Sequence, residues 1–132
     1  PRAVTAEETA HSAHIEERKL AKTVVVKIDD QMTMVVLHAD EKIDLMRLKD
    51  SLGVGSVELA SEREFEARFP DCEIGAMPPF GDLFGMPVIV SETVASDEYL
   101  TLNAGTHTEL ITIPYRDFAM NVRPMIGRFS SH

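Results

Sequence analysis

The segment from Asp71 to Gly81, which reads DCEIGAMPPFG, holds the residue types and spacing that most suggest a binding site. Proline fixes its own φ and lacks an N–H, and glycine permits close backbone approaches that a side chain would block. The segment therefore predicts a shaped loop that presents its backbone to a ligand. A plain connector between a helix and the next strand would carry the same residues, so composition alone leaves both interpretations open.

Cysteine and histidine give weaker chemical signals. Cys72 is the one cysteine, which excludes an internal disulfide and a thiolate-rich zinc site and fits a reducing compartment. A nucleophilic Cys72 activated by His107 is conceivable, but a lone cysteine is more often a small buried hydrophobe. His11 and His14 have the i,i+3 spacing of helical metal ligands, yet no third ligand lies nearby. We expect no metal site and no cofactor.

Size and charge limit the class of protein. A chain of 132 residues that is 44% hydrophobic predicts one domain over residues 1–132. The net charge of -9 argues against binding along a nucleic-acid backbone, so no DNA partner is expected, although a local basic patch stays open. No apolar run approaches the roughly 20 residues that span a bilayer, which predicts a soluble, cytoplasmic protein without a membrane partner. The first residue is Pro1 rather than Met, so we expect the N-terminus to be truncated.

The first third of the chain predicts a helix followed by a hairpin. Thr5-Ala6-Glu7-Glu8 has a capping-box pattern, typical of a helix start. The β-branched runs Lys22–Ile28 and Met32–Leu37 flank Asp29-Asp30-Gln31, a short turn-forming joint. Because the runs barely alternate between apolar and polar residues, we expect both faces of the hairpin to be covered.

A second helix is predicted after the hairpin. Asp40 is placed to cap it, with Ile43, Met46 and Leu52 on one face, and Gly53 is placed to end it.

Weaker signals follow. Ser56–Ala60 predicts an edge strand, and Ser61-Glu62-Arg63-Glu64 predicts a capping box that opens a short helix ending at Pro70. The acidic residues are interpreted as solvated helix faces and most methionines as core filler. These are Asp40, Glu41, Glu62, Glu64 and Glu66, and Met32, Met34 and Met46.

The C-terminal half predicts three more strands. Pro87–Ser91 is typical of a buried strand, and Tyr99–Leu102 and Glu109–Ile113 flank a tight turn at Asn103–Thr106. Pro114 fits the N1 position of a final helical turn that includes Phe118. Strands mixed with short helices, without regular βαβ alternation, predict an α+β domain around a mixed, barrel-like β-sheet.

Three of these signals in this order carry a family resemblance: Ala21–Val26 entering a strand, the Gly75–Gly81 loop after a short helix, and Asn103–His107 before a strand. The chain resembles the YbaK/prolyl-tRNA synthetase-associated domain family, from the Thr5 helix to the Asp117 segment. The resemblance implies a barrel-like mixed sheet flanked by short helices. It also implies an editing activity, which hydrolyses the ester between a wrong amino acid and its tRNA, and is nearest to the free-standing members.

The resemblance also assigns roles to residues. Lys22 matches the family lysine expected near the 3′-terminal adenosine or its phosphate, and Gly75 matches a loop whose bare N–H can polarise the ester carbonyl. Both are implied to be catalytic. Such an ester needs water, orientation and an oxyanion donor, so the lack of a Ser-His-Asp pattern does not count against hydrolysis. The residues implied to bind substrate are Ala76, Met77, Pro78, Pro79, Gly105 and His107.

Two functions stay open at this point. The first is a trans-editing aminoacyl-tRNA deacylase that recognises the tRNA acceptor end and a small amino acid, with an aminoacyl-tRNA synthetase as a further expected partner. The second is a non-catalytic binding module of the same fold, which holds an aminoacyl or nucleotide-like ligand or docks on a synthetase. Lys22 and the Gly75–Pro79 loop favour the enzyme, whereas the net charge of -9 favours the module.

Overall fold

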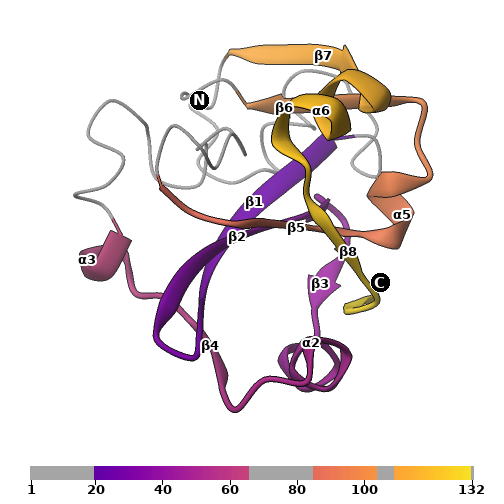
Figure 1. The fold of residues 1–132 in the computed structure, drawn as a ribbon. Coiled ribbons are helices and arrows are strands. Elements are labelled where there is room, and N and C mark those ends of the chain that lie inside the picture. Colours follow the sequence, from indigo (N-terminus) through magenta and orange to yellow (C-terminus); the bar gives the residue numbers. More distant parts are fainter. Residues whose placement is uncertain (1–19, 66–84, 104–108, 132) are drawn as a thin grey trace.

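The computed structural model describes residues 20–65, 85–103 and 109–131 (Figure 1). The Thr5 helix, the helical histidines, Cys72, the Gly75–Gly81 loop and the predicted turn after Asn103 lie outside these ranges. The strands are β1 Leu20–Ile28, β2 Gln31–His38, β3 Lys42–Ile43, β4 Val57–Leu59, β5 Val88–Ser91, β6 Tyr99–Asn103, β7 Leu110–Pro114, β8 Met125–Gly127 and β9 Ser130–Ser131. The helices are α2 Leu45–Leu52, α3 Glu62–Phe65, α5 Glu92–Ala95 and α6 Tyr115–Val122.

The predicted hairpin is confirmed. β1 and β2 pair antiparallel and meet at Ile28 and Gln31. The joint is Asp29-Asp30, whose φ angles are 48° and 69°. Positive φ at both central residues is typical of the type I′ turn, which matches the twist of paired strands.

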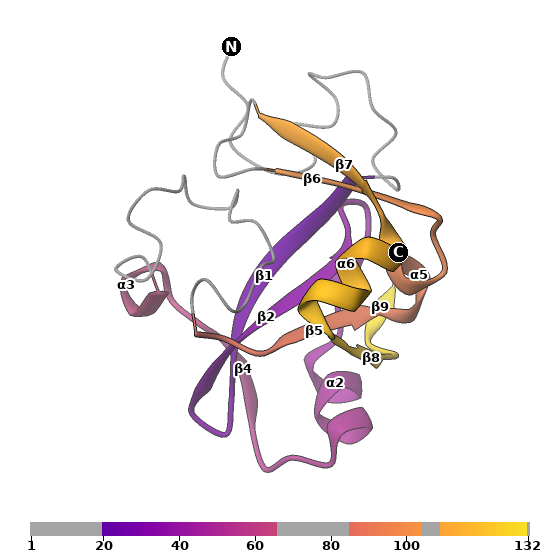
Figure 2. The ribbon, with the colours of Figure 1, turned by 45° about the horizontal axis from the view of Figure 1, so that its top comes forward.

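The sheet is mixed and open within the described residues, and the α+β prediction is confirmed. Its strand order is β7-β6-β1-β2-β5-β8, and β4 pairs with the end of β1. β1–β6, β2–β5 and β5–β8 are parallel pairs, whereas β1–β2 and β6–β7 are antiparallel. A separate two-stranded sheet joins β3 to β9. Figure 2 shows this arrangement with β6 and β7 at one end.

The centre of the sheet is buried on both faces, as the continuous apolar runs predicted. Met34 and Val36 of β2 pack in one core cluster with Phe118 of α6, while Val35 and Leu37 pack in another with Leu48 of α2. The two helices therefore cover opposite faces of the same strand, because successive side chains point to opposite sides.

The helix after the hairpin begins later than predicted. Its N-cap is Asp44, whose carboxylate accepts from the Arg47 N–H at 3.1 Å, and not Asp40. Ile43 is not in the helix, because Lys42 and Ile43 pair with the C-terminal residues as β3. Met46 is 67% exposed, so its interpretation as core filler was wrong; Leu48 is the buried residue of α2.

Other local predictions are confirmed. Gly53 ends α2 with φ 65°, in the left-handed region that favours glycine. Ser61 and Glu64 form the reciprocal capping box of α3, with Ser61 N donating to Glu64 Oε1 at 2.9 Å and Glu64 N to Ser61 Oγ at 3.3 Å. The edge strand predicted over Ser56–Ala60 is present as β4, and the buried strand over Pro87–Ser91 as β5.

The strand pair β6–β7 is also confirmed, but the final helix differs in detail. Pro114 is the last residue of β7 and the N-cap of α6, rather than its N1 residue, because it still pairs with Tyr99. The helix continues past Phe118 to Val122. Neither α5, β8 nor β9 was predicted.

Candidate functional site

Lys22 is the residue of the predicted site that the structure describes. It lies on β1 opposite Leu37 of β2 and is partly buried. Its ammonium donates to the Ala39 carbonyl oxygen at 3.2 Å. The Ala39 N–H in turn donates to the Leu20 carbonyl at 2.7 Å, which ties the segment after β2 to the start of β1. The position of the lysine charge is therefore linked to the backbone just beyond β2.

The other predicted site residues lie outside the described ranges and stay predictions. They are Gly75, Ala76, Met77, Pro78 and Pro79 in residues 66–84, and Gly105 and His107 in residues 104–108.

The pairing of β1 with β6 places Lys22 relative to the strand that comes before residues 104–108. Parallel pairing of β1 and β6 matches Ala21 with Leu102, and Lys22 and Asn103 are the next residues along each strand. Asn103 is only 4% exposed and is the last described residue before position 104. The strand register thus brings Lys22 close to Asn103.

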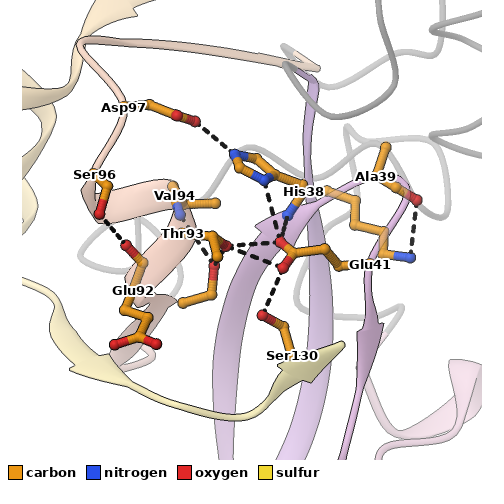
Figure 3. A network of polar contacts seen from close by, with 11 residues as sticks. His38, Ala39, Glu41, Glu92, Thr93, Val94, Ser96, Asp97 and Ser130 are labelled. Atoms are coloured by element: carbon orange, nitrogen blue, oxygen red, sulfur yellow. Dashed lines mark hydrogen bonds and ion pairs between the residues drawn. The ribbon is translucent and has the colours of Figure 1, made fainter. Parts of the chain in front are cut away.

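A buried carboxylate, that of Glu41, follows Ala39 by two residues in the chain. Glu41 is 1% exposed, so the prediction of a solvated helix face was wrong for this residue. Glu41 Oε1 accepts from the His38 backbone N–H at 2.9 Å, and Glu41 Oε2 accepts from Ser130 Oγ at 2.8 Å. Thr93 Oγ1 donates to the same carboxylate at 2.8 Å (Figure 3). The charge is thus solvated by protein donors instead of water.

The pKa of Glu41 reflects these contacts. Burial is the largest single influence and acts to raise the pKa of the carboxyl group, because it disfavours the charged form. Hydrogen bonds from Ser130, the His38 N–H and Thr93 together outweigh burial and leave the pKa of Glu41 below its ordinary value. Glu41 is therefore an anion at neutral pH.

The His38 side chain lies between two carboxylates. Its Nε2 is 2.5 Å from Asp97 Oδ2, and its Nδ1 is 3.3 Å from Glu41 Oε1 (Figure 3). A neutral ring donates from only one of its two nitrogens, so the tautomer decides which carboxylate it can bond. The sequence reasoning missed this cluster, although a histidine that ends a buried strand three residues before a glutamate was a usable signal.

A surface hollow lies beside Asp97. It measures about 620 Å³ and runs between the start of β6 and the N-terminus of α6, where Tyr99, Tyr115 and Arg116 line it. Burial raises the pKa of Tyr115 above its ordinary value. Lys22 is not among the lining residues, so the hollow is separate from the predicted catalytic position.

Acidic and histidine side chains in residues 20–65, 85–103 and 109–131 form no group of three or more that could hold a metal ion. His38, Glu41 and Asp97 instead engage one another and nearby hydroxyl groups. This arrangement can hold charged side chains and the backbone of the turn after β2 in fixed positions. In the same ranges, no helix is long and apolar enough to cross a membrane.

Comparison with known proteins identifies the family. The family model for the aminoacyl-tRNA editing domain matches residues 1–120, and the chain belongs to this family. A proline–tRNA ligase of Bacillus cereus is 31% identical over 90 residues, which cover 68% of this chain and 16% of the ligase. The chain thus spans only a small part of the length of such relatives. The resemblance drawn from Lys22 and the glycine loop is confirmed at the level of the family.

Solved structures show the same fold. The crystal structure of the hypothetical protein APE2540 matches with a TM-score of 0.84 and 19% identity, covering 99% of this chain and 87% of that chain. The structure of a candidate trans-editing enzyme for prolyl-tRNA synthetase matches with a TM-score of 0.82 and 17% identity, covering 98% of this chain and 82% of that chain. At these identities the match establishes the fold.

Proposed function

We propose that this protein is an aminoacyl-tRNA deacylase that acts in trans on mischarged tRNA carrying a small amino acid. The observation that carries the proposal is the Lys22 ammonium, held by the Ala39 carbonyl at 3.2 Å in a chain of the editing-domain family. The fold shared with a candidate trans-editing enzyme adds support.

In the proposed reaction, a water oxygen attacks the carbonyl carbon of the aminoacyl ester. The bond from that carbon to the ribose oxygen then breaks, and the ribose oxygen leaves with a proton. The neighbouring ribose hydroxyl activates the ester, so orientation and oxyanion stabilisation supply most of what the step requires. No covalent enzyme intermediate is needed.

Each predicted residue has a role in this scheme. Lys22 places a positive charge against the 3′-terminal adenosine or its phosphate. The Gly75 N–H donates to the developing oxyanion, because a bare backbone amide can approach the ester closely. The remaining positions line the aminoacyl pocket: Ala76, Met77, Pro78, Pro79, Gly105 and His107.

The net charge of -9 restricts how tRNA is held. Phosphate charges are neutralised by lysine and arginine, and the chain has an acidic excess. We therefore propose that the contact is confined to the acceptor end, with further affinity supplied by a synthetase partner. The match to part of a proline–tRNA ligase favours a synthetase of that type.

The same net charge favours one alternative, a non-catalytic module that binds an aminoacyl or nucleotide-like ligand or docks on a synthetase. A module of this kind needs no tRNA affinity of its own. A salt titration of tRNA binding separates the two: a shallow slope indicates few phosphate contacts and supports the deacylase, whereas no binding at any salt concentration supports the module.

The decisive experiment is a deacylation screen with tRNAs mischarged with alanine, serine, cysteine, threonine and proline. Wild-type protein is compared with Lys22→Ala and with Lys27→Ala, a matched control on the same strand that pairs with Glu58 and Glu64. Hydrolysis of one or two substrates that is lost in Lys22→Ala but kept in Lys27→Ala supports the proposal. Folded wild-type protein with no turnover on any substrate contradicts it.

A further inference from the structure

The turn between β2 and β3 connects Lys22 to the buried glutamate. Ala39, which accepts the hydrogen bond from Lys22, follows His38 directly and precedes Glu41 by two residues. The Glu41 N–H donates to the His38 carbonyl at 3.0 Å, and the His38 N–H donates back to the Glu41 carboxylate at 2.9 Å. Residues 38–41 are thus closed into a compact turn by both the backbone and the side chain of Glu41.

The Glu41 carboxylate also ties this turn to two distant elements. Thr93 belongs to α5 and Ser130 to β9, and each hydroxyl donates to the carboxylate at 2.8 Å (Figure 3). Ser91, the N-cap residue of α5, contacts the Thr93 hydroxyl at 2.9 Å, which holds that donor in place. The Glu41 carboxylate therefore holds the turn of residues 38–41 against both α5 and β9.

We propose that Glu41 is a positioning residue for the deacylation reaction: it fixes the Ala39 carbonyl and, through that carbonyl, the Lys22 ammonium. The inference rests on the proposed function, in which Lys22 engages the tRNA terminus. A lysine ammonium sits on a flexible four-carbon stem, so a fixed backbone acceptor limits where its charge can lie. A displacement of about 1 Å at a reacting centre is enough to slow a reaction by about 100-fold.

A purely structural role for Glu41 makes a different prediction. Loss of buried hydrogen bonds then lowers the fraction of folded protein, but it leaves the activity of each folded molecule unchanged. It also acts independently of Lys22. A double-mutant cycle separates the two roles, because residues that act through one another give non-additive effects.

The experiment compares wild type, Glu41→Gln, Lys22→Ala and the double variant in single-turnover deacylation, with rates corrected for the folded fraction. Glutamine has nearly the same size but removes the charge and one acceptor. Glu92→Gln is the matched control, because Glu92 lies beside Thr93 on α5 and forms an exposed ion pair with Arg128. We expect Glu41→Gln to lower kcat/KM about tenfold, Glu92→Gln to leave it unchanged, and Glu41→Gln to add no further loss to Lys22→Ala.

A second readout does not depend on activity. The ¹⁵Nζ signal of Lys22, assigned by its absence in Lys22→Ala, is expected to shift in Glu41→Gln and to stay unchanged in Glu92→Gln. Should Glu41→Gln not fold, Ser130→Ala serves instead, since it removes one donor and leaves the carboxylate, and it is expected to shift the same signal less.

The outcomes separate the two proposals. An unmoved Lys22 signal in a folded Glu41 or Ser130 variant overturns the positioning role, whatever the activity. The positioning role is also overturned if Glu41→Gln lowers the rate by the same factor in wild type and in Lys22→Ala. If wild type hydrolyses no substrate, the proposed function fails, while a Lys22 signal that moves in Glu41→Gln but not in Glu92→Gln still supports the placement of Lys22 by Glu41.

Discussion

Lys27 Nζ lies 2.6 Å from Glu64 Oε2, so an ion pair joins the end of the hairpin strand β1 to the first turn of α3. Lys27 also contacts Glu58 of β4 at 3.2 Å. Glu64 belongs to the capping box of α3 and accepts from the Ser61 N–H as well. These contacts hold the described start of α3, Glu62–Phe65, against the sheet.

Acid should weaken this attachment. The hydrogen bond from Lys27, followed by those from Ser61, lowers the pKa of Glu64 from 4.5 to about 2. A depressed folded-state pKa means that Glu64 contributes stability above pH 4.5 and loses it as the pH falls toward 2. We expect Glu64→Gln to flatten the fall in unfolding free energy over this interval, as measured by urea denaturation. Lys27→Met should flatten it less, because the hydrogen bonds from Ser61 remain, and a full acid slope in both variants would contradict this account.

Glu41→Leu should be strongly destabilising. Leucine removes the acceptor of the buried His38 N–H and of the part-buried hydroxyls of Thr93 and Ser130. Unsatisfied buried donors cost about 1–3 kcal/mol each, so we expect a loss of about 3 kcal/mol or more in urea unfolding, with a smaller loss for Glu41→Gln. Glu92→Leu, at an exposed site, should change stability by less than about 1 kcal/mol. Equal effects at both positions would refute a special role for burial.

The turn of the hairpin offers a stabilising substitution. Asp30 has φ 69°, a left-handed conformation that costs an L-residue about 1–2 kcal/mol and glycine very little. We expect Asp30→Gly to stabilise the protein by about 0.5 kcal/mol after the entropy of the unfolded glycine is subtracted. Asp29 should not be changed to glycine, because its carboxylate accepts from the Ser56 N–H at 2.8 Å. Thermal unfolding of Asp30→Gly and Asp29→Gly checks this prediction, which is wrong if Asp29→Gly is the more stable variant.

Lys22 should be sensitive to shape as well as charge. We expect Lys22→Ala to lower the deacylation rate by about 100-fold or more, and Lys22→Arg to lower it about tenfold, because a planar guanidinium does not occupy the place of a compact ammonium. Lys27→Ala should stay within about twofold of wild type, since it lies toward the other end of β1. Single-turnover kinetics on the substrate found by the screen would measure all three, and full activity of Lys22→Ala would exclude the catalytic role.

Local signals predicted much of the fold. The Asp29-Asp30 turn, the Ser61 capping box and the buried strand at Val88 each follow from residues that are neighbours in the chain. Strands of two or three residues, such as Lys42–Ile43, carry no period of their own and exist only because a distant partner pairs with them. The shift of the helix cap from Asp40 to Asp44 has the same cause.

The candidate site was likewise predicted only in part. Lys22 was found because a motif at a strand start marks it, and the two predicted loops around Gly75 and Gly105 await a test. Glu41 was misjudged, because an acidic residue in isolation is best solvated by water. Its burial depends on a hydrogen bond from Ser130, which lies 89 positions further along the chain. The sequence around Glu41 does not indicate that donor.

That separation has a consequence for the order of folding. The parallel pairs β1–β6 and β5–β8 and the bond between Glu41 and Ser130 all join residues remote in sequence. Contacts of this kind must overcome the entropy of closing long loops, so chains rich in them fold in milliseconds to seconds rather than microseconds. The hairpin of β1 and β2 can form early, but the turn that holds Lys22 is complete only when the distant segment around Ser130 packs against Glu41.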